Sequence, residues 1–88
     1  MVCRLAKDVQ VRKESWGLLF YSSAKHKLRF IRSGDLLYPR HFDGTWTLEH
    51  LVDDVARRKD NSVNAINPSI QNLIKYLIDS ELIINEPC

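Results

Sequence analysis

The chain has 88 residues, of which 44% are apolar and 27% are charged, and its formal net charge is +2. This length and composition predict one folded domain over residues 1–88, with a core at about 9–84, and exclude a disordered protein. No apolar run approaches the roughly 20 residues of a membrane helix. Residues 1–5 lack the apolar block of a secretory signal. We therefore expect a cytoplasmic protein without membrane association.

Positive charge is concentrated in the N-terminal half. Residues 1–40 contain nine Lys and Arg against three Asp and Glu, whereas residues 41–88 contain four against eight. The N-terminal half is therefore a candidate surface for an acidic partner, although two solvated faces of opposite sign would give the same pattern.

The first third of the chain has the patterns of β-strands. Val9, Val11 and Lys13 alternate with polar neighbours, and residues 16–22 are rich in aromatic side chains. The polar residues 23–26 predict a hairpin connection to residues 27–32. We expect three short antiparallel strands, the last two joined by this hairpin.

After residue 33 the pattern changes from strand to helix. Residues 34–42 predict a short or interrupted helix that ends at Asp43 and Gly44. Pro39 lacks an N–H donor and crowds the preceding turn. This helix is therefore expected either to start late, near Tyr38, or to be irregular.

A second helix is predicted after Thr47, which is a suitable N-cap residue. Its apolar stripe runs over residues 48–56. Basic side chains at residues 57–59 suit the negative end of the helix dipole. A polar loop is expected to follow at residues 60–64.

The third helix has the clearest local signals. Asn67 is its predicted cap, Pro68 fills its first position, and an apolar stripe runs over residues 70–78. The helix is expected to end near Ser80. Residues 82–84 would then pack or pair as a short tail.

Three strands followed by three helices predict an α+β domain with helices on one face of a three-stranded antiparallel sheet. The apolar stripes of the helices need a partner surface. The expected inward-facing side chains are those of Leu18, Phe20, Leu28 and Phe30.

The last predicted strand carries Lys27, Arg29 and Arg32. Such charges protect an exposed strand edge from wrong pairing. The same charges would suit an edge that accepts an acidic, extended peptide as a fourth strand. On the third helix, Asn72, Tyr76 and Asp79 lie on a polar flank that could form either a groove wall or an ordinary boundary of the core. The residues alone leave these alternatives open.

No constellation of side chains points to catalysis. Each candidate lacks metal-ligand spacing and is expected at the surface: His26, His41, His50, Asp53 and Asp54. The sequence has no phosphate loop, nucleophile elbow or Walker-type lysine. Cys3 and Cys88 are expected to be incidental thiols near the two ends. We therefore expect no catalytic residue, no metal and no cofactor.

Residues 11–21, VRKESWGLLFY, followed by residues 27–33, KLRFIRS, resemble the N-terminal signature of the PqqD-like family. The shared features are Val-Arg-x-Glu, then Gly, then Tyr, then Lys-Leu-x-Phe, and they are most similar to the mycofactocin-chaperone branch. Residues 80–83 resemble the end of the family's closing helix. Members of this family are recognition elements for ribosomally made, modified peptides.

The resemblance implies a winged-helix-like fold in which the leader of a precursor peptide adds to the third strand and lies against the third helix. The docking edge would be Lys27, Leu28, Arg29, Phe30, Ile31 and Arg32, and the groove wall would be Ser69, Asn72, Leu73 and Tyr76. The module would deliver the peptide to a radical S-adenosylmethionine enzyme, whose chemistry this chain does not carry. Pro39 and Asp53–Asp54 depart from the family pattern. Whether the module forms a homodimer is left open.

The main alternative is a winged-helix DNA-binding domain, in which the last two helices would form a helix-turn-helix. A recognition helix should offer several basic or amide side chains. Here it offers Gln71, Asn72 and Lys75 in an acidic half of the chain. A structural subunit without peptide affinity is a second alternative. We therefore expect no nucleic-acid partner.

Overall fold

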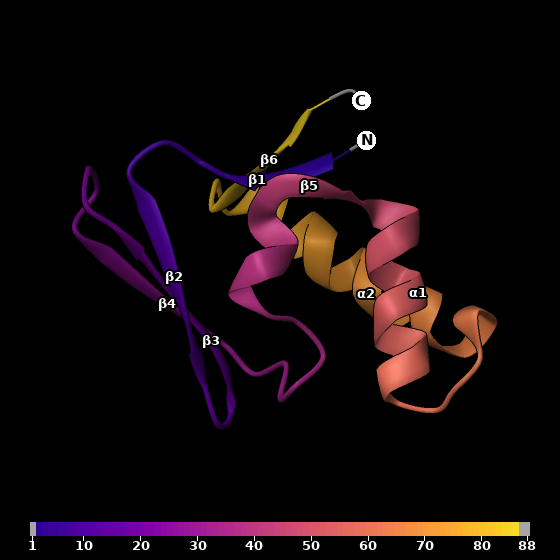
Figure 1. Ribbon diagram of the computed structural model, residues 1–88. Helices are drawn as coiled ribbons and strands as arrows, with labels where there is room; N and C mark the ends of the chain where they lie inside the picture. The colour runs from indigo at the N-terminus through magenta and orange to yellow at the C-terminus, as the bar shows by residue number, and fades with distance from the viewer. Residues whose placement is uncertain (1, 87–88) are drawn as a thin grey trace.

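Strands from both ends and the middle of the chain form two antiparallel sheets in the computed structural model, which describes residues 2–86 (Figure 1). The first sheet has the order β2-β3-β4, and the second has the order β5-β1-β6. The strands are β1 (Val2–Leu5), β2 (Val9–Glu14), β3 (Gly17–Ser22), β4 (Lys27–Ile31), β5 (Asp43–Thr47) and β6 (Ile83–Glu86). With two helices, the domain is α+β, as the sequence predicts, but with one sheet more than expected.

The β2-β3-β4 sheet confirms the three predicted strands and the predicted hairpin between the last two. Phe20 lies opposite Arg29, and Leu18 lies opposite Ile31. Paired residues share a face of the sheet, so Ile31 is buried beside Leu18 and Phe20. The expectation that Leu28 and Phe30 face the core is wrong, because they lie on the other face and are 52% and 64% exposed.

The second sheet joins the beginning of the described chain to its end. β1 is the central strand, with Val2 opposite Glu86 and Leu5 opposite Ile83 on one side and β5 on the other. The predicted tail therefore pairs as a strand. Cys3 is fully buried in β1, which corrects its expected place at a frayed end, and this burial raises the pKa of its thiol. Cys88 lies outside the described residues.

Helix α1 (Leu48–Arg58) begins where the sequence predicts, and the Thr47 side chain accepts a hydrogen bond from the His50 amide. Helix α2 (Val63–Asp79) ends as predicted but begins earlier, because Ser62 caps it by accepting from the Ala65 amide. The expected cap at Asn67 is therefore wrong, and Pro68 lies inside the helix. Among residues 2–86, no helix is long and apolar enough to cross a membrane.

The first of the three expected helices is a single 3-10 turn, η1 (Pro39–Phe42), with Tyr38 at its N-cap. The helical turn does start late, as Pro39 requires, but it ends after one turn, and β5 follows directly after Phe42. The core between the sheets and helices includes Phe20, Phe42 and Leu51, all at most 1% exposed. Phe20 and Phe42 meet edge to face, with ring centroids 5.8 Å apart. The turn therefore connects the two sheets through the core.

Gly17 opens β3 at a point where no other residue fits. Its φ is +151°, and a Cβ there would overlap the Ile31 carbonyl oxygen and lie 2.6 Å from the Ser33 amide nitrogen. Both contacts are to backbone, which cannot move aside cheaply. The close approach of the β2-β3 turn to the end of β4 therefore depends on this glycine.

Replacing Gly17 with alanine is expected to lower the free energy of unfolding by at least about 2 kcal/mol, because Ile31 or the turn must move. Gly34 is the matched control, since it has a positive φ but no neighbouring atom within 4 Å of the point where a Cβ would lie. Gly34→Ala should cost only about 1 kcal/mol, the penalty of a left-handed alanine. Urea unfolding followed by circular dichroism measures both, and equal losses would contradict the role given to Gly17.

Candidate functional site

The outer edge of β4 is the most exposed strand surface in the described part of the chain. Residues Lys27 to Phe30 are all exposed, and only Ile31 is buried. No strand within residues 2–86 pairs with this edge, because β4 is the end strand of its sheet. The C-terminal strand β6 pairs with β1 and leaves β4 uncovered.

The pairing pattern identifies which backbone groups of β4 point outward. The Ser23 amide, just after β3, donates to the Asp8 carbonyl on the β2 side. Because successive residues of a strand point to opposite edges, Ser22 and Phe20 face β4, and their partners Lys27 and Arg29 face back toward β3. The N–H and C=O groups of Leu28 and Phe30 therefore point away from the sheet. They are available to an added strand.

A basic groove of about 230 Å³ lies beside β4 and reaches the end of α2. Its lining residues come from β3, β4, the hairpin and the C-terminal end of α2: Ser22, Lys25, Lys27, Arg29, Asp79, Ser80, Glu81 and Leu82. Lys25 forms an ion pair with Glu81, and its hydrogen bond holds the pKa of the Glu81 carboxyl below the usual range. Lys27 and Arg29 have no ion-pair partner within residues 2–86.

The residues expected to form a docking site are only partly brought together. Of the expected edge, Lys27 and Arg29 line the basic groove, and Leu28 and Phe30 lie on the opposite face of the sheet. Arg32 is exposed just beyond β4, whereas Ile31 is buried in the core and cannot contact a docked peptide with its side chain. Of the expected wall, Ser69, Asn72 and Tyr76 are exposed on α2, Leu73 is half-buried, and none of these four lines the groove.

The groove instead uses residues that sequence reasoning did not assign to the site. Asp79 is the exception, because it belongs to the polar flank of α2 that the sequence offered as a possible groove wall. Lys25 and Glu81 are 56 positions apart, and their pairing has no local signal.

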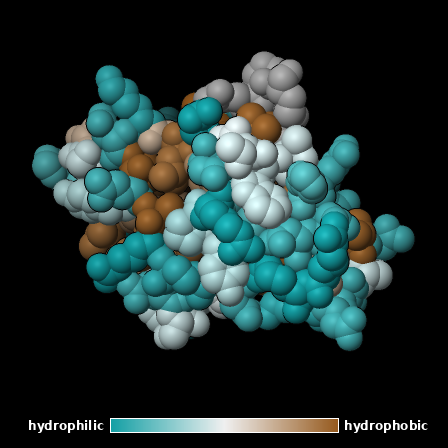
Figure 2. Space-filling model, viewed as in Figure 1, coloured by the Kyte–Doolittle hydropathy of each residue, from teal (hydrophilic) through white to brown (hydrophobic). Residues whose placement is uncertain are grey.

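The outer face of the β2-β3-β4 sheet carries an apolar patch formed by Trp16, Tyr21, Leu28 and Phe30, all of which are exposed. The rings of Trp16 and Phe30 are in contact, with centroids 5.7 Å apart. On the face drawn in Figure 2, hydrophobic side chains gather over this sheet, whereas the side formed by α1 and α2 is mostly hydrophilic. A cluster of exposed aromatic side chains often marks an interaction surface.

A second cluster, buried and polar, surrounds His41 in η1. The His41 side chain is fully buried, so the expectation of a surface histidine is wrong. Its Nδ1 accepts a hydrogen bond from the Tyr38 amide at 3.0 Å, and its Nε2 lies 3.0 Å from Asp54 Oδ2. Because Nδ1 is an acceptor, the neutral ring carries its proton on Nε2 and donates it to Asp54. Burial lowers the pKa of His41, and the bond to Asp54 offsets this only in part.

Asp54 of α1 links this helix to η1 by accepting several hydrogen bonds. Its Oδ2 also accepts from Arg40 at 3.2 Å and from Arg58 Nε at 3.1 Å. The Arg58 Nη atoms donate to the carbonyls of Asp35 and Leu36 at 2.7 Å each. Burial acts to raise the pKa of Asp54, but the bonds from His41 and Arg58 outweigh it and leave the pKa lowered. Asp54 is therefore not the freely solvated carboxylate that the sequence predicts.

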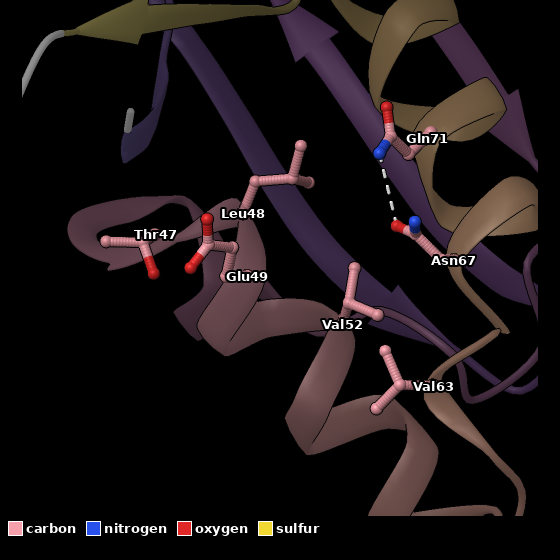
Figure 3. Close-up of a pocket in the computed structure, with 7 residues that line it drawn as sticks. All are labelled: Thr47, Leu48, Glu49, Val52, Val63, Asn67 and Gln71. Atoms are coloured by element: carbon pink, nitrogen blue, oxygen red, sulfur yellow. Dashed lines mark hydrogen bonds between the residues drawn. The ribbon is translucent and has the colours of Figure 1, made fainter.

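A cavity of about 630 Å³ lies between the beginning of α1 and the N-terminal half of α2 (Figure 3). Figure 3 shows Val52 and Val63 opposite each other, with Asn67 and Gln71 pointing from α2 toward Leu48. Gln71 donates to Asn67 at 3.2 Å. Glu49 is the only ionisable side chain in its lining, so these residues offer no acid–base or nucleophile pair.

Comparisons with protein-family models, with curated proteins and with solved structures find no match to this chain. Residues 2–86 also contain no group of three or more His, Cys, Asp or Glu side chains that could hold a metal ion. The candidate site therefore rests on the geometry of β4 and the groove beside it.

Removal of the Asp54 side chain should lower the stability of the fold. Asp54→Ala leaves the buried Nε2–H of His41 without its acceptor and is expected to cost about 2 kcal/mol or more. Asp53→Ala is the neighbouring control. Among residues 2–86, Asp53 forms one ion pair, with Arg57 one turn along the surface of α1, and its loss should change stability by at most about 0.5 kcal/mol. Urea titration of both variants checks this, and similar losses would contradict a special role for Asp54.

The stability of the protein should also fall in mildly acidic solution. In the unfolded chain His41 binds a proton near pH 6.5, whereas in the fold its lowered pKa keeps it neutral below that pH. The unfolded state then binds more protons, so the free energy of unfolding decreases as pH drops below about 6.5. Urea unfolding between pH 8 and pH 5 measures this slope. His41→Gln should be less stable at pH 8 and should lack the part of the slope that His41 contributes.

Proposed function

We propose that this chain is a non-catalytic chaperone that binds the leader of a ribosomally made precursor peptide by strand addition to β4. The module then presents the peptide to a radical S-adenosylmethionine enzyme. The observation that carries the proposal is the uncovered outer edge of β4, where Leu28 and Phe30 direct their backbone groups away from the sheet. Main-chain hydrogen bonds at such an edge provide affinity for an extended peptide.

The other outer strands are less suited to accept a visitor. β2 packs beside η1, and β5 packs beside both η1 and α1. β6 packs against α2, with Ile83 buried. Because of these contacts, β2, β5 and β6 each have a neighbouring element beside them. In β4, by contrast, four successive residues are exposed.

The resemblance of residues 11–33 to the PqqD-like family supports the same edge. Those residues form β2, β3 and β4, and family members are expected to dock a leader between the third strand of this sheet and the last helix. Here the basic groove joins β4 to the C-terminal end of α2, the last helix. A winged-helix-like arrangement and membership of the mycofactocin-chaperone branch are the finer parts of this proposal.

The positive charge of β4 indicates the kind of peptide that would bind there. Lys27 and Arg29 make the edge positive, which favours an acidic leader and accelerates its encounter. Pairing of two copies through β4 would place these cations against those of the second copy, and like charges opposite each other are destabilising. The charge of β4 therefore favours a separate acidic peptide over a homodimer at this edge.

The proposal also assigns the protein to the cytoplasm beside its maturation enzyme. A gene for a short acidic peptide and a gene for a radical enzyme next to the gene for this chain would support that arrangement. Pull-down of the radical enzyme by the peptide-loaded module, and not by the empty module, would test the delivery step.

Replacing Leu28 with proline should abolish strand addition, because it removes an outward N–H while leaving the ladder to β3 intact. Leu28→Ala is the matched control, since it shortens the same side chain but keeps the donor. With acidic 15-residue peptides selected from a displayed library, calorimetry should show at least about tenfold weaker binding to the proline variant than to the alanine variant.

Circular dichroism and urea unfolding of both variants establish that the helices remain folded. Equal affinities of the two folded variants would exclude the β4 edge as the binding site. Tight binding of duplex DNA in a low-salt gel shift, with no peptide affinity, would instead favour the helix-turn-helix alternative.

A further inference from the structure

We infer that the segment bound at β4 alternates acidic and apolar side chains, with the acidic ones in the basic groove and the apolar ones on the outer apolar patch. The inference rests on the proposed strand addition and specifies what that edge would select. It follows from the two different surfaces that lie on either side of β4.

Alternation follows from the geometry of any added strand. Successive side chains of a strand point to opposite faces of the sheet. A residue opposite Leu28 or Phe30 would therefore point to the outer face, and its neighbours would point to the face of Lys27 and Arg29. This holds for a parallel and for an antiparallel visitor, because both place paired side chains on the same face.

The outer face offers apolar contacts to such a strand. Pairing aligns Leu19 with Phe30 and Tyr21 with Leu28 in two rows across the sheet. These rows end at β4, where Phe30 and Leu28 are more than half exposed, and Trp16 contacts the Phe30 ring. An aromatic or branched apolar residue opposite either side chain would extend its row and shield it from water.

The groove side offers charge. Lys27 and Arg29 have no ion-pair partner within the described chain, whereas the nearby Lys25 is already paired with Glu81. Asp79 is the remaining carboxylate of the groove lining. Two unpaired cations against one carboxylate leave an excess of positive charge, which suits carboxylates at alternate positions of the visitor.

A second copy of this chain fits the patch less well than a peptide does. The four exposed side chains of the patch present on the order of 400 Å², about half of the roughly 800 Å² that each partner contributes to a stable interface. A strand added at β4 would cover the part of the patch at Leu28 and Phe30 while also bonding the backbone edge.

Two synthetic peptides of identical composition test the inference. The first is Glu-Phe-Glu-Ile-Glu-Phe-Glu, and the second is its block isomer Glu-Glu-Phe-Phe-Ile-Glu-Glu, both with blocked ends. The alternating peptide should bind at least about tenfold more tightly by calorimetry, because only it satisfies both faces at once. Nuclear magnetic resonance titration should place its largest shifts at the amides of β4.

Variants of the full chain separate the two faces. Lys27→Glu combined with Arg29→Glu should reverse the preference, so that Lys-Phe-Lys-Ile-Lys-Phe-Lys binds at least about tenfold more tightly than the acidic peptide. Phe30→Ser should weaken the alternating peptide about fivefold or more. Ile84→Ser is the matched control, because Ile84 is an exposed strand residue of the other sheet, and it should leave affinity unchanged.

The outcomes distinguish this inference from the proposed function. Equal binding of the two isomers at β4 would overturn the alternating preference while leaving strand addition in place. Absence of shifts at β4 with these peptides, together with failure of a displayed random library to yield any binder at that edge, would overturn both. Binding of the acidic peptide undiminished by the Lys27 and Arg29 reversal would show that the groove does not select charge.

Discussion

The pairing of β3 with β4 determines what the first sheet presents to its surroundings. With Leu18 opposite Ile31, the cations of β4 share a face with the core and border the groove, and Leu28 and Phe30 lie outside. A shift of one residue would exchange the two sets. Gly17 holds this register, because its missing side chain leaves room for the Ile31 carbonyl. The basic groove and the outer apolar patch therefore have one common cause.

The link between the two sheets depends on a different constraint. Residues 35–42 run between them with no regular structure except the short 3-10 turn η1, and their polar groups would be costly to bury unless they were bonded. Asp54 and Arg58 supply those bonds from one turn of α1, to His41, to Arg40 and to two backbone carbonyls. The rings of Tyr38 and Trp46 pack against this polar cluster. The guanidinium carbon of Arg40 lies 4.9 Å from the centroid of the Tyr38 ring and 5.8 Å from that of Trp46. Of the acidic pair Asp53 and Asp54, the second is therefore a structural residue.

The sequence predicted the features that arise from neighbouring residues and missed those that arise from distant ones. Alternation and turn composition indicated β2, β3 and β4, and the Thr47 cap indicated α1. β1 and β6 are short strands from opposite ends of the chain, so no local pattern indicates their pairing. Alternation also separates the two faces of β4 without saying which one is buried, which explains the error at Leu28 and Phe30. At α2, the cap formed by Ser62 prevailed over the strong local signal of Asn67 and Pro68.

The candidate site likewise has a part that the sequence predicted and a part that it did not. Its strand could be predicted, because charge and alternation are visible in residues 27–32. Of its opposite wall, helical spacing indicated only Asp79, because the fold brings the end of α2, rather than its middle, to the groove beside β4.

The two tryptophans of the chain stand in separate surroundings, and this gives the molecule two optical reporters. Trp16 contacts Phe30 beside the open edge, whereas Trp46 meets the His41 ring edge to face at 4.9 Å. Indole emission shifts with solvent access, so the first ring reports on coverage of the sheet and the second on protonation and loosening of the turn. Replacing either tryptophan with phenylalanine would leave a single indole, whose emission wavelength would report on only one of these two events.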